Sequence, residues 1–185
     1  LQSAETPELF AASALAFGRF QQMLKDYPAD TLYETIPRFH DTEDRLAKLK
    51  AAVAADAMGR VKDVQAELDF VTAREEEAGT LQRLRESGAM PLRVTHNDTK
   101  LNNVLMDRKS GEGVCVIDLD TVMPGLSIND FGDSIRFGAN HCAEDEKDLS
   151  KVNFDLSLFE VYTQGFLEGA NGALTQAELD YLPWG

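Results

Sequence analysis

Hydrophobic positions in the first half of the chain recur at the spacing of amphipathic helices. Thr6-Pro7 has the form of a helix N-cap followed by a first-turn proline, and apolar residues then repeat with helical period until Pro28. A second such pattern follows Asp41, and a third runs from Val61 to about Ser87. The sequence therefore predicts three helices before residue 90, with apolar faces that pack into a core.

The pattern changes at Pro91, where short apolar runs begin to alternate with turn residues. Three such runs are predicted strands, at Leu92–Val94, Asn103–Met106 and Val114–Ile117. A polar, glycine-containing segment joins the last two runs, which is typical of a β-hairpin. Cys115 lies inside the third run, so we expect its side chain to be buried in the strand.

Helical spacing returns after Asp130. One helix is predicted to begin at Asn153 or Asp155, and Thr175-Gln176-Ala177-Glu178 has the form of a capping box that begins another. The chain contains no internal repeat that would indicate a second copy of any unit. We therefore predict an α+β fold in which residues 1–185 form one unit, mainly helical, with a small β-hairpin.

The amino-acid composition restricts the cellular compartment expected for the protein and the kinds of partner expected to bind it. A length of 185 residues with 43% hydrophobic and 27% charged residues is typical of a folded globular domain. The net charge of −14 argues against nucleic acid or an anionic membrane surface as a partner. The sequence has no long apolar run, no signal-peptide pattern, and only Cys115 and Cys142, which form no C-x-x-C pair. We therefore expect a soluble, cytoplasmic protein.

Residues 95–103 and 116–120 carry the most informative polar pattern. The first segment contains Asp98 and Asn103 at H-x-D-x4-N spacing, and the second places Asp118 directly after an apolar run. Phosphoryl transfer from a magnesium nucleotide requires a base for the attacking hydroxyl and oxygen ligands for the metal. We therefore predict Asp98 as the general base, with Asn103 and Asp118 as Mg²⁺ ligands that the hairpin brings together.

Four nearby residues are predicted to support this site. His96 is expected to hold the loop by hydrogen bonds, and Lys100 either neutralises the transferred phosphoryl group or is an exposed lysine. Asp120 follows Asp118 by two positions and points the same way in an extended chain. It is an outer metal ligand, a ligand of a substrate hydroxyl, or a surface residue. Asp130 begins a D-F-G sequence, but Asp118 is better placed for the metal, so Asp130 is expected to begin a helix and hold the loop.

These residues resemble the pattern of the aminoglycoside phosphotransferase and choline kinase superfamily. The shared features are the H-x-D-x4-N loop, the I-D-x-D sequence after it, and a D-x-x-D helix start. The sequence is most similar to the bacterial N-acetylhexosamine 1-kinases, and the resemblance covers nearly the whole chain. It is strongest at residues 36–42, 91–107, 117–125 and 130–139.

The resemblance implies the C-terminal catalytic lobe of a protein-kinase-like fold, with ATP as co-substrate and Mg²⁺ as cofactor. The acceptor would be the anomeric hydroxyl of N-acetylglucosamine or N-acetylgalactosamine, and the candidate sugar-binding residues are Asp120, Arg136 and Phe137. No glycine-rich turn between strands precedes residue 90, so we expect the N-terminal nucleotide lobe to belong to a longer chain. The 185 residues alone are expected to be inactive, and their uncovered cleft face could drive dimerisation.

Two other functions are compatible with the sequence. The same superfamily contains kinases for aminoglycosides, choline, homoserine and other sugars. An acidic surface would suit a polycationic aminoglycoside, whereas 8% aromatic residues and a single tryptophan count against choline. A catalytically silent binding module derived from a kinase is an alternative from another class, but Asp98, Asn103 and Asp118, whose loss would mark such a module, are all present.

Overall fold

The computed structural model describes residues 6–185, which divide into two compact units. The first unit consists of the residues up to Thr35 together with Pro91–Gly185, and the second is Ile36–Met90. The prediction that residues 1–185 form one catalytic lobe stays a prediction.

Most helices of the first unit begin where the sequence predicts, but the helix expected to begin at Asp130 begins three residues earlier, at Ser127. Its elements are α1 (Pro7–Met23), β1 (Arg93–Thr95), β2 (Val104–Met106), β3 (Gly113–Val116), β4 (Met123–Gly125), α6 (Ser127–Gly138), α7 (Leu156–Ala170) and α8 (Gln176–Asp180). The side chains of Thr6 and Asp155 cap α1 and α7, and Thr175 and Glu178 form the expected capping box of α8. These helix starts are therefore confirmed.

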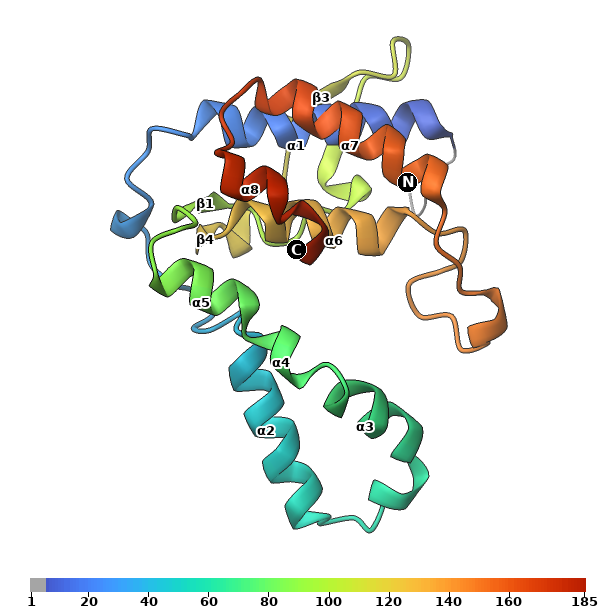
Figure 1. The fold of residues 1–185 in the computed structure, drawn as a ribbon. Coiled ribbons are helices and arrows are strands. Elements are labelled where there is room, and N and C mark those ends of the chain that lie inside the picture. The colour runs from blue at the N-terminus through green and yellow to red at the C-terminus, as the bar shows by residue number, and fades with distance from the viewer. Residues whose placement is uncertain (1–5) are drawn as a thin grey trace. The chain divides into compact units, whose positions relative to one another are not determined.

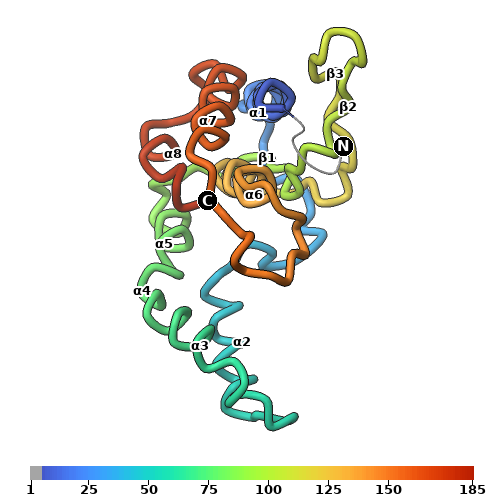
Figure 2. Tube along the Cα trace, turned by 90° about the vertical axis from the view of Figure 1, so that its right-hand side faces the viewer, coloured from blue at the N-terminus to red at the C-terminus, as the bar shows by residue number. Residues whose placement is uncertain are grey.

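α1 and α7 lie side by side and pack closely against each other (Figures 1 and 2). Glycines allow the two backbones to approach closely. A β carbon at Gly18 would lie 2.2 Å from the carbonyl oxygen of Phe166, and one at Gly169 would lie 2.4 Å from that of Leu15. The largest buried side chains of the core include Tyr162, Phe10, Phe17, Phe131 and Phe166. Packing at this density leaves no room for added atoms at the glycine contacts.

The predicted hairpin is confirmed. β2 and β3 pair antiparallel, with Val104 opposite Val116 and Leu105 opposite Cys115. Val116 packs against a buried cluster that includes Phe20, whereas Leu105 and Cys115 are exposed. The expectation that Cys115 is buried was therefore wrong, because β3 is covered on neither face at this point: Cys115 and its neighbour Val114, which point to opposite faces, are both exposed.

β1 pairs antiparallel with β4, a strand that the sequence pattern did not predict. The register places Thr95 opposite Met123 and Arg93 opposite Gly125. β4 has three residues, Met-Pro-Gly, and so lacks the β-branched and aromatic residues that identify a strand in a sequence. The pair matters for the site because β1 leads directly into the predicted catalytic loop.

The second unit is helical. α2 (Thr42–Ala55) begins at the predicted cap, Asp41, whose carboxylate accepts a hydrogen bond from a backbone N–H. The third predicted helix is divided into α3 (Gln65–Thr72), α4 (Glu75–Ala78) and α5 (Thr80–Glu86). Gly79 separates α4 from α5, as the low helix propensity of glycine would favour.

The predicted apolar stripes of the second unit do not form a tight core. Side chains from α2 and α3, including Leu46, Val53, Leu68 and Val71, line a hollow of about 310 Å³. No residue of either helix is fully buried. The core expected here is therefore an open apolar groove.

Candidate active site

Hydrogen bonds to Asp130 of α6 fix the conformation of the loop between β1 and β2. Asp130, in the first turn of that helix, is buried and accepts hydrogen bonds from the backbone N–H groups of His96, at 2.9 Å, and Asn97, at 2.8 Å. Asn97 has a φ of 65°, a left-handed conformation that asparagine tolerates better than most residues. Its side chain donates to the carbonyl oxygen of Thr121 at 2.8 Å. The loop conformation is thus set by contacts on both sides.

His96 joins this loop to the end of the hairpin. Its ring is fully buried, and its Nε2 lies 2.9 Å from the carbonyl oxygen of Ile117. Nδ1 accepts a hydrogen bond from the backbone N–H of Asp98 at 3.3 Å. A neutral imidazole that accepts at Nδ1 donates at Nε2, so both contacts fit one tautomer. His96 therefore connects Asp98 to the residue that precedes Asp118.

Asp98 and Asn103 contact each other directly. The Asn103 Nδ2 donates to the Asp98 carboxylate at 2.9 Å and to the Asp98 carbonyl oxygen at 2.8 Å. Asn103 is only 6% exposed, whereas the Asp98 side chain is 30% exposed. Since both amide hydrogens of Asn103 are directed at Asp98, its carboxamide oxygen is left to face another group. Asp98 is therefore oriented and still accessible.

Asp118 follows β3 in a left-handed conformation, with φ at 62°. This region is uncommon for residues other than glycine, and residues held in it are concentrated at functional sites. β3 is partly exposed rather than the buried strand that the sequence suggested. The side chains of Asp118 and Asp120 are exposed, and in the described structure neither forms a hydrogen bond or ion pair with another residue. Both carboxylates are available to a ligand.

Lys100 lies between two carboxylates. Its Nζ is 3.2 Å from Asp98 Oδ1 and 3.9 Å from Glu144 Oε2. Partial burial opposes its charge, but the hydrogen bond to Asp98 and the two nearby acids raise the pKa of Lys100 above its usual value. Arg136 also binds Glu144, at 2.9 Å, and pairs with Asp133 at 2.9 Å. Lys100 is therefore a cation held beside the predicted base.

The remaining predicted substrate-binding residue, Phe137, is half-buried on α6 beside the exposed Arg136.

Sequence reasoning did not identify Glu144 as a neighbour of the site, because an acid in a run of acids resembles a solvated surface. It also missed Gln21, a buried α1 residue that contacts Asp130. A single polar residue in an amphipathic helix has no pattern that would have identified it.

Asn103 and Asp118 fit a magnesium ion in chemical type. They offer a carboxamide oxygen and a carboxylate, which are donors that Mg²⁺ prefers. The backbone N–H of Ile117 donates to the Asn103 carbonyl oxygen at 2.9 Å, so both residues lie at the same end of the hairpin. No group of three or more His, Cys, Asp or Glu side chains in residues 6–185 could hold a metal ion. The pair suits an ion that completes its coordination with nucleotide phosphates and water.

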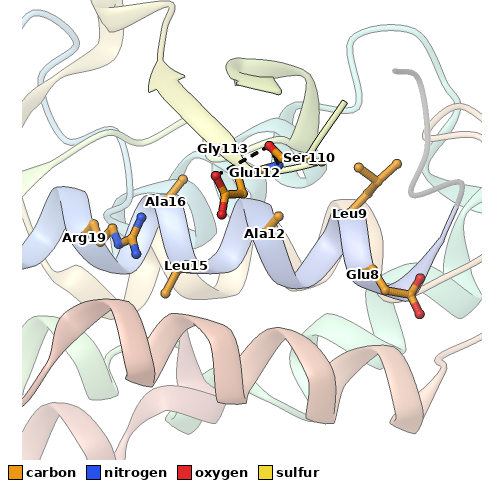
Figure 3. A pocket seen from close by; sticks show the side chains of 10 residues that line it. Glu8, Leu9, Ala12, Leu15, Ala16, Arg19, Ser110, Glu112 and Gly113 are labelled. Atoms are coloured by element: carbon orange, nitrogen blue, oxygen red, sulfur yellow. Dashed lines mark hydrogen bonds between the residues drawn. The ribbon is translucent and has the colours of Figure 1, made fainter. Parts of the chain in front are cut away.

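Two hollows lie along α1. One of about 250 Å³ lies between α1 and the hairpin turn, where Ser110 donates to Glu112 at 3.5 Å (Figure 3). The other, of about 480 Å³, lies between the end of α1 and β3, and its lining includes the exposed side chains of Met23, Val114 and Leu119. The second hollow is an apolar face of the kind expected beside the hairpin, and dimerisation through it stays a prediction.

None of the helices in residues 6–185 has the length and apolar character needed to cross a membrane.

A family model described as the phosphotransferase enzyme family matches residues 1–155, and the chain belongs to that family. The predicted fold class, a mainly helical α+β kinase-like lobe, is confirmed by two solved structures.

The first of these is the amicoumacin kinase hAmiN in complex with AMP-PNP, Ca²⁺ and Ami. It is 16% identical, with a TM-score of 0.53 over 98% of this chain and 48% of that chain. The second is an aminoglycoside-3'-phosphotransferase of type VIII. It is 20% identical, with a TM-score of 0.50 over 100% of this chain and 62% of that chain. At these identities the similarity shows the fold alone, and the chain spans only about half to three-fifths of each compared structure.

Proposed function

We propose that this chain is the catalytic lobe of an ATP-dependent kinase that phosphorylates the anomeric hydroxyl of N-acetylglucosamine or N-acetylgalactosamine. The observation that carries the proposal is the accessible Asp98 carboxylate, oriented by Asn103 at the hairpin end from which Asp118 projects. Family membership supports phosphotransfer. The choice of sugar rests on the sequence resemblance around residues 36–42 and 130–139.

In this proposal Asp98 is the general base. Its ionised carboxylate would orient the acceptor hydroxyl and take its proton as the bond from that oxygen to the γ-phosphorus forms. The bond between the γ-phosphorus and the leaving oxygen of ADP breaks in the same step. Asn103 keeps the carboxylate directed, so little reorganisation is needed when the acceptor arrives.

Asn103 and Asp118 would hold Mg²⁺, which, when bound with ATP, would neutralise charge on the phosphates. Lys100 would place a positive charge near the transferred phosphoryl group, and its two carboxylate neighbours favour its charged form. His96 and Asp130 would hold the loop. Asp120, Arg136 and Phe137 are the proposed residues on the sugar side.

The activity is proposed for a longer protein that contains this chain, since the chain spans only part of the compared kinases. An N-terminal lobe in that protein would supply the remaining nucleotide contacts, and we expect the 185 residues by themselves to show no meaningful turnover.

An antibiotic acceptor is the second candidate. It is favoured by one observation, the fold similarity to an aminoglycoside phosphotransferase and to an amicoumacin kinase. The long sequence resemblance to hexosamine kinases ranks the sugar above it.

The test is ADP release by the full-length protein with Mg²⁺-ATP and a panel of acceptors. The panel contains N-acetylglucosamine, N-acetylgalactosamine, glucose, galactose, kanamycin, amicoumacin and choline. We expect turnover confined to the N-acetylated sugars and lost by about 10²–10⁴-fold in Asp98→Asn. The exposed acid Asp145, changed to Asn, is the matched control and should leave the rate unchanged. Turnover with an antibiotic would replace the sugar assignment, and ATP binding without any turnover would favour a silent module.

A further inference from the structure

Gln21 is a buried polar residue of α1 to which the proposed function gives no role. It is 2% exposed, and its Nε2 donates to Asp130 Oδ2 at 2.7 Å and to the Val94 carbonyl oxygen at 3.3 Å. A buried carboxamide is costly unless its hydrogen bonds are formed. These two bonds join α1 to β1 and to α6 at the point where the predicted catalytic loop begins.

The polar groups that contact the Asp130 carboxylate are hydrogen-bond donors. Its Oδ2 accepts from Gln21 and from the backbone N–H of His96, and its Oδ1 accepts from the backbone N–H of Asn97. Within residues 6–185, Gln21 supplies the side-chain donor to this carboxylate, and the other two donors are backbone groups. An ionised carboxylate only accepts hydrogen bonds, whereas a protonated one must also donate. The donor shell therefore matches the ionised form.

Ionisation of Asp130 is finely balanced. Burial raises its pKa to about 6, although the hydrogen bonds from His96, Asn97 and Gln21 act in the opposite direction. A protonated Asp130 would place a hydrogen atom where a donor now points, so one contact to the loop or to α1 would be lost. The hydrogen bond from Gln21 thus affects whether Asp130 is ionised near neutral pH.

The other titratable groups around Asp130 come from the loop, from α7 and from α6 itself. The positive charge that the His96 ring carries when it is protonated lowers the pKa of Asp130. Burial raises the pKa of Tyr162 on α7, and the charges of Asp130 and Asp133 raise it further, so its phenol stays neutral near neutral pH. α1 presents the uncharged Gln21.

The contacts of Asp130 continue to the proposed chemistry. Asp130 holds the backbone of His96, and the His96 ring in turn holds the Asp98 N–H and the Ile117 carbonyl oxygen. A substitution at Gln21 would therefore alter the positions of both the proposed base and the strand end that carries Asp118, although Gln21 itself would not contact the substrate.

We propose that Gln21 is a positioning residue, whose carboxamide keeps Asp130 in its hydrogen-bond-accepting form and so holds the loop from His96 to Asp98 in place. Its effect on turnover rests on the proposed function, whereas its effect on Asp130 does not.

The experiment uses the full-length protein with Gln21→Met, which removes both N–H donors at similar volume. Gln22→Met, at the half-buried next position, is the control. The amide ¹H–¹⁵N shifts of His96 and Asn97 are followed through a pH titration, because a carboxylate that accepts from an amide moves its shift on protonation. In Gln21→Met we expect the midpoint to rise by about one pH unit, the effect of a lost hydrogen bond to a carboxylate. In Gln22→Met it should not move.

A second measurement needs no variant and covers the case in which Gln21→Met does not fold. In the unsubstituted protein, the Gln21 side-chain amide protons should shift with the same midpoint as the His96 and Asn97 amides. Independent behaviour of those protons, or an unchanged midpoint in a folded Gln21→Met protein, would overturn the proposal.

Turnover separates this inference from the proposed function. In an active enzyme, the acid limb of the kcat/KM profile should move upward with the amide midpoint in Gln21→Met. A moved midpoint with an unmoved acid limb would show that Gln21 is merely structural and would overturn the positioning role. A moved midpoint in a protein without kinase activity would support the Gln21–Asp130 relationship and reject the proposed function.

Discussion

The Asn103 side chain directs both of its amide hydrogens at Asp98, one to the carboxylate at 2.9 Å and one to the backbone carbonyl at 2.8 Å. One residue can therefore orient the proposed base with its nitrogen and bind the proposed metal with its oxygen. Removal of the side chain should therefore have two separate effects, a lower kcat and weaker binding of Mg²⁺.

Asn103→Ala should lower kcat and raise the Mg²⁺ concentration needed for half-maximal rate by about 10–100-fold, the range seen when groups that support a metal site are removed. The measurement is ADP release by the full-length protein over a Mg²⁺ series. Asn102→Ala is the matched control, because Asn102 is the exposed residue that directly precedes Asn103. Equal losses in both variants would contradict the assignment.

Asp118 and Asp120 should differ in what their substitution changes. Asp118→Asn is expected to raise the half-saturating Mg²⁺ concentration by more than about tenfold, since it removes the carboxylate charge that a hard cation prefers. If Asp120 binds a sugar hydroxyl, Asp120→Asn raises the KM for the acceptor and leaves the Mg²⁺ dependence unchanged. A Mg²⁺ effect from Asp120→Asn would instead make Asp120 an outer metal ligand.

Gly169→Ala should destabilise the fold because a β carbon at this position would lie 2.4 Å from the Leu15 carbonyl oxygen. Backbone atoms cannot move aside as a side chain can, so α1 and α7 would have to separate. We expect a loss of about 1–3 kcal/mol in the free energy of unfolding, measured by urea denaturation. Glu168→Ala, at the exposed neighbouring position, should cost much less.

Glu178→Gln should destabilise the protein in a pH-dependent way. Glu178 is fully buried and binds Arg93 through both oxygens, at 2.5 and 2.7 Å, while Ser127 donates to it at 2.6 Å. Burial alone would raise the pKa of Glu178, but the hydrogen bonds from Arg93 and Ser127 dominate and lower it. Its stabilising contribution is therefore present above the unfolded-state pKa and is lost as the pH falls through the folded-state pKa.

At pH 7 we expect Glu178→Gln to cost about 3–5 kcal/mol, because the largely buried Arg93 is left without its carboxylate partner. The difference from the unsubstituted protein should begin to shrink below about pH 4, where the unfolded-state carboxyl takes up a proton, and should disappear below the lowered folded-state pKa of Glu178, where the side chains of Glu178 and its Gln replacement are both neutral. Chemical denaturation across this range measures it, with the exposed Asp180→Asn on the same helix as control. A pH-independent difference would argue against the ion pair.

Local chemistry allowed the sequence to determine much of the fold. The caps at Thr6, Asp41 and Asp155 depend on residues within three or four positions, so they can be read without knowledge of the rest of the chain. The hairpin between β2 and β3 is also local and was found. β4 was missed because Met-Pro-Gly becomes a strand only when β1 lies beside it.

The candidate site likewise has some features that the sequence determines and others that only the tertiary structure decides. The spacing of Asp98, Asn103 and Asp118 determined by itself which residues gather at the hairpin end, because a loop and a hairpin bring near neighbours together. Tertiary structure alone decided that Gln21 reaches Asp130, that Glu144 approaches Lys100 and that Cys115 is exposed. Gln21 and Asp130 are 109 positions apart. Such contacts depend on how α1 and α6 pack against β1, and no periodicity within either helix encodes which buried polar side chain will meet which partner.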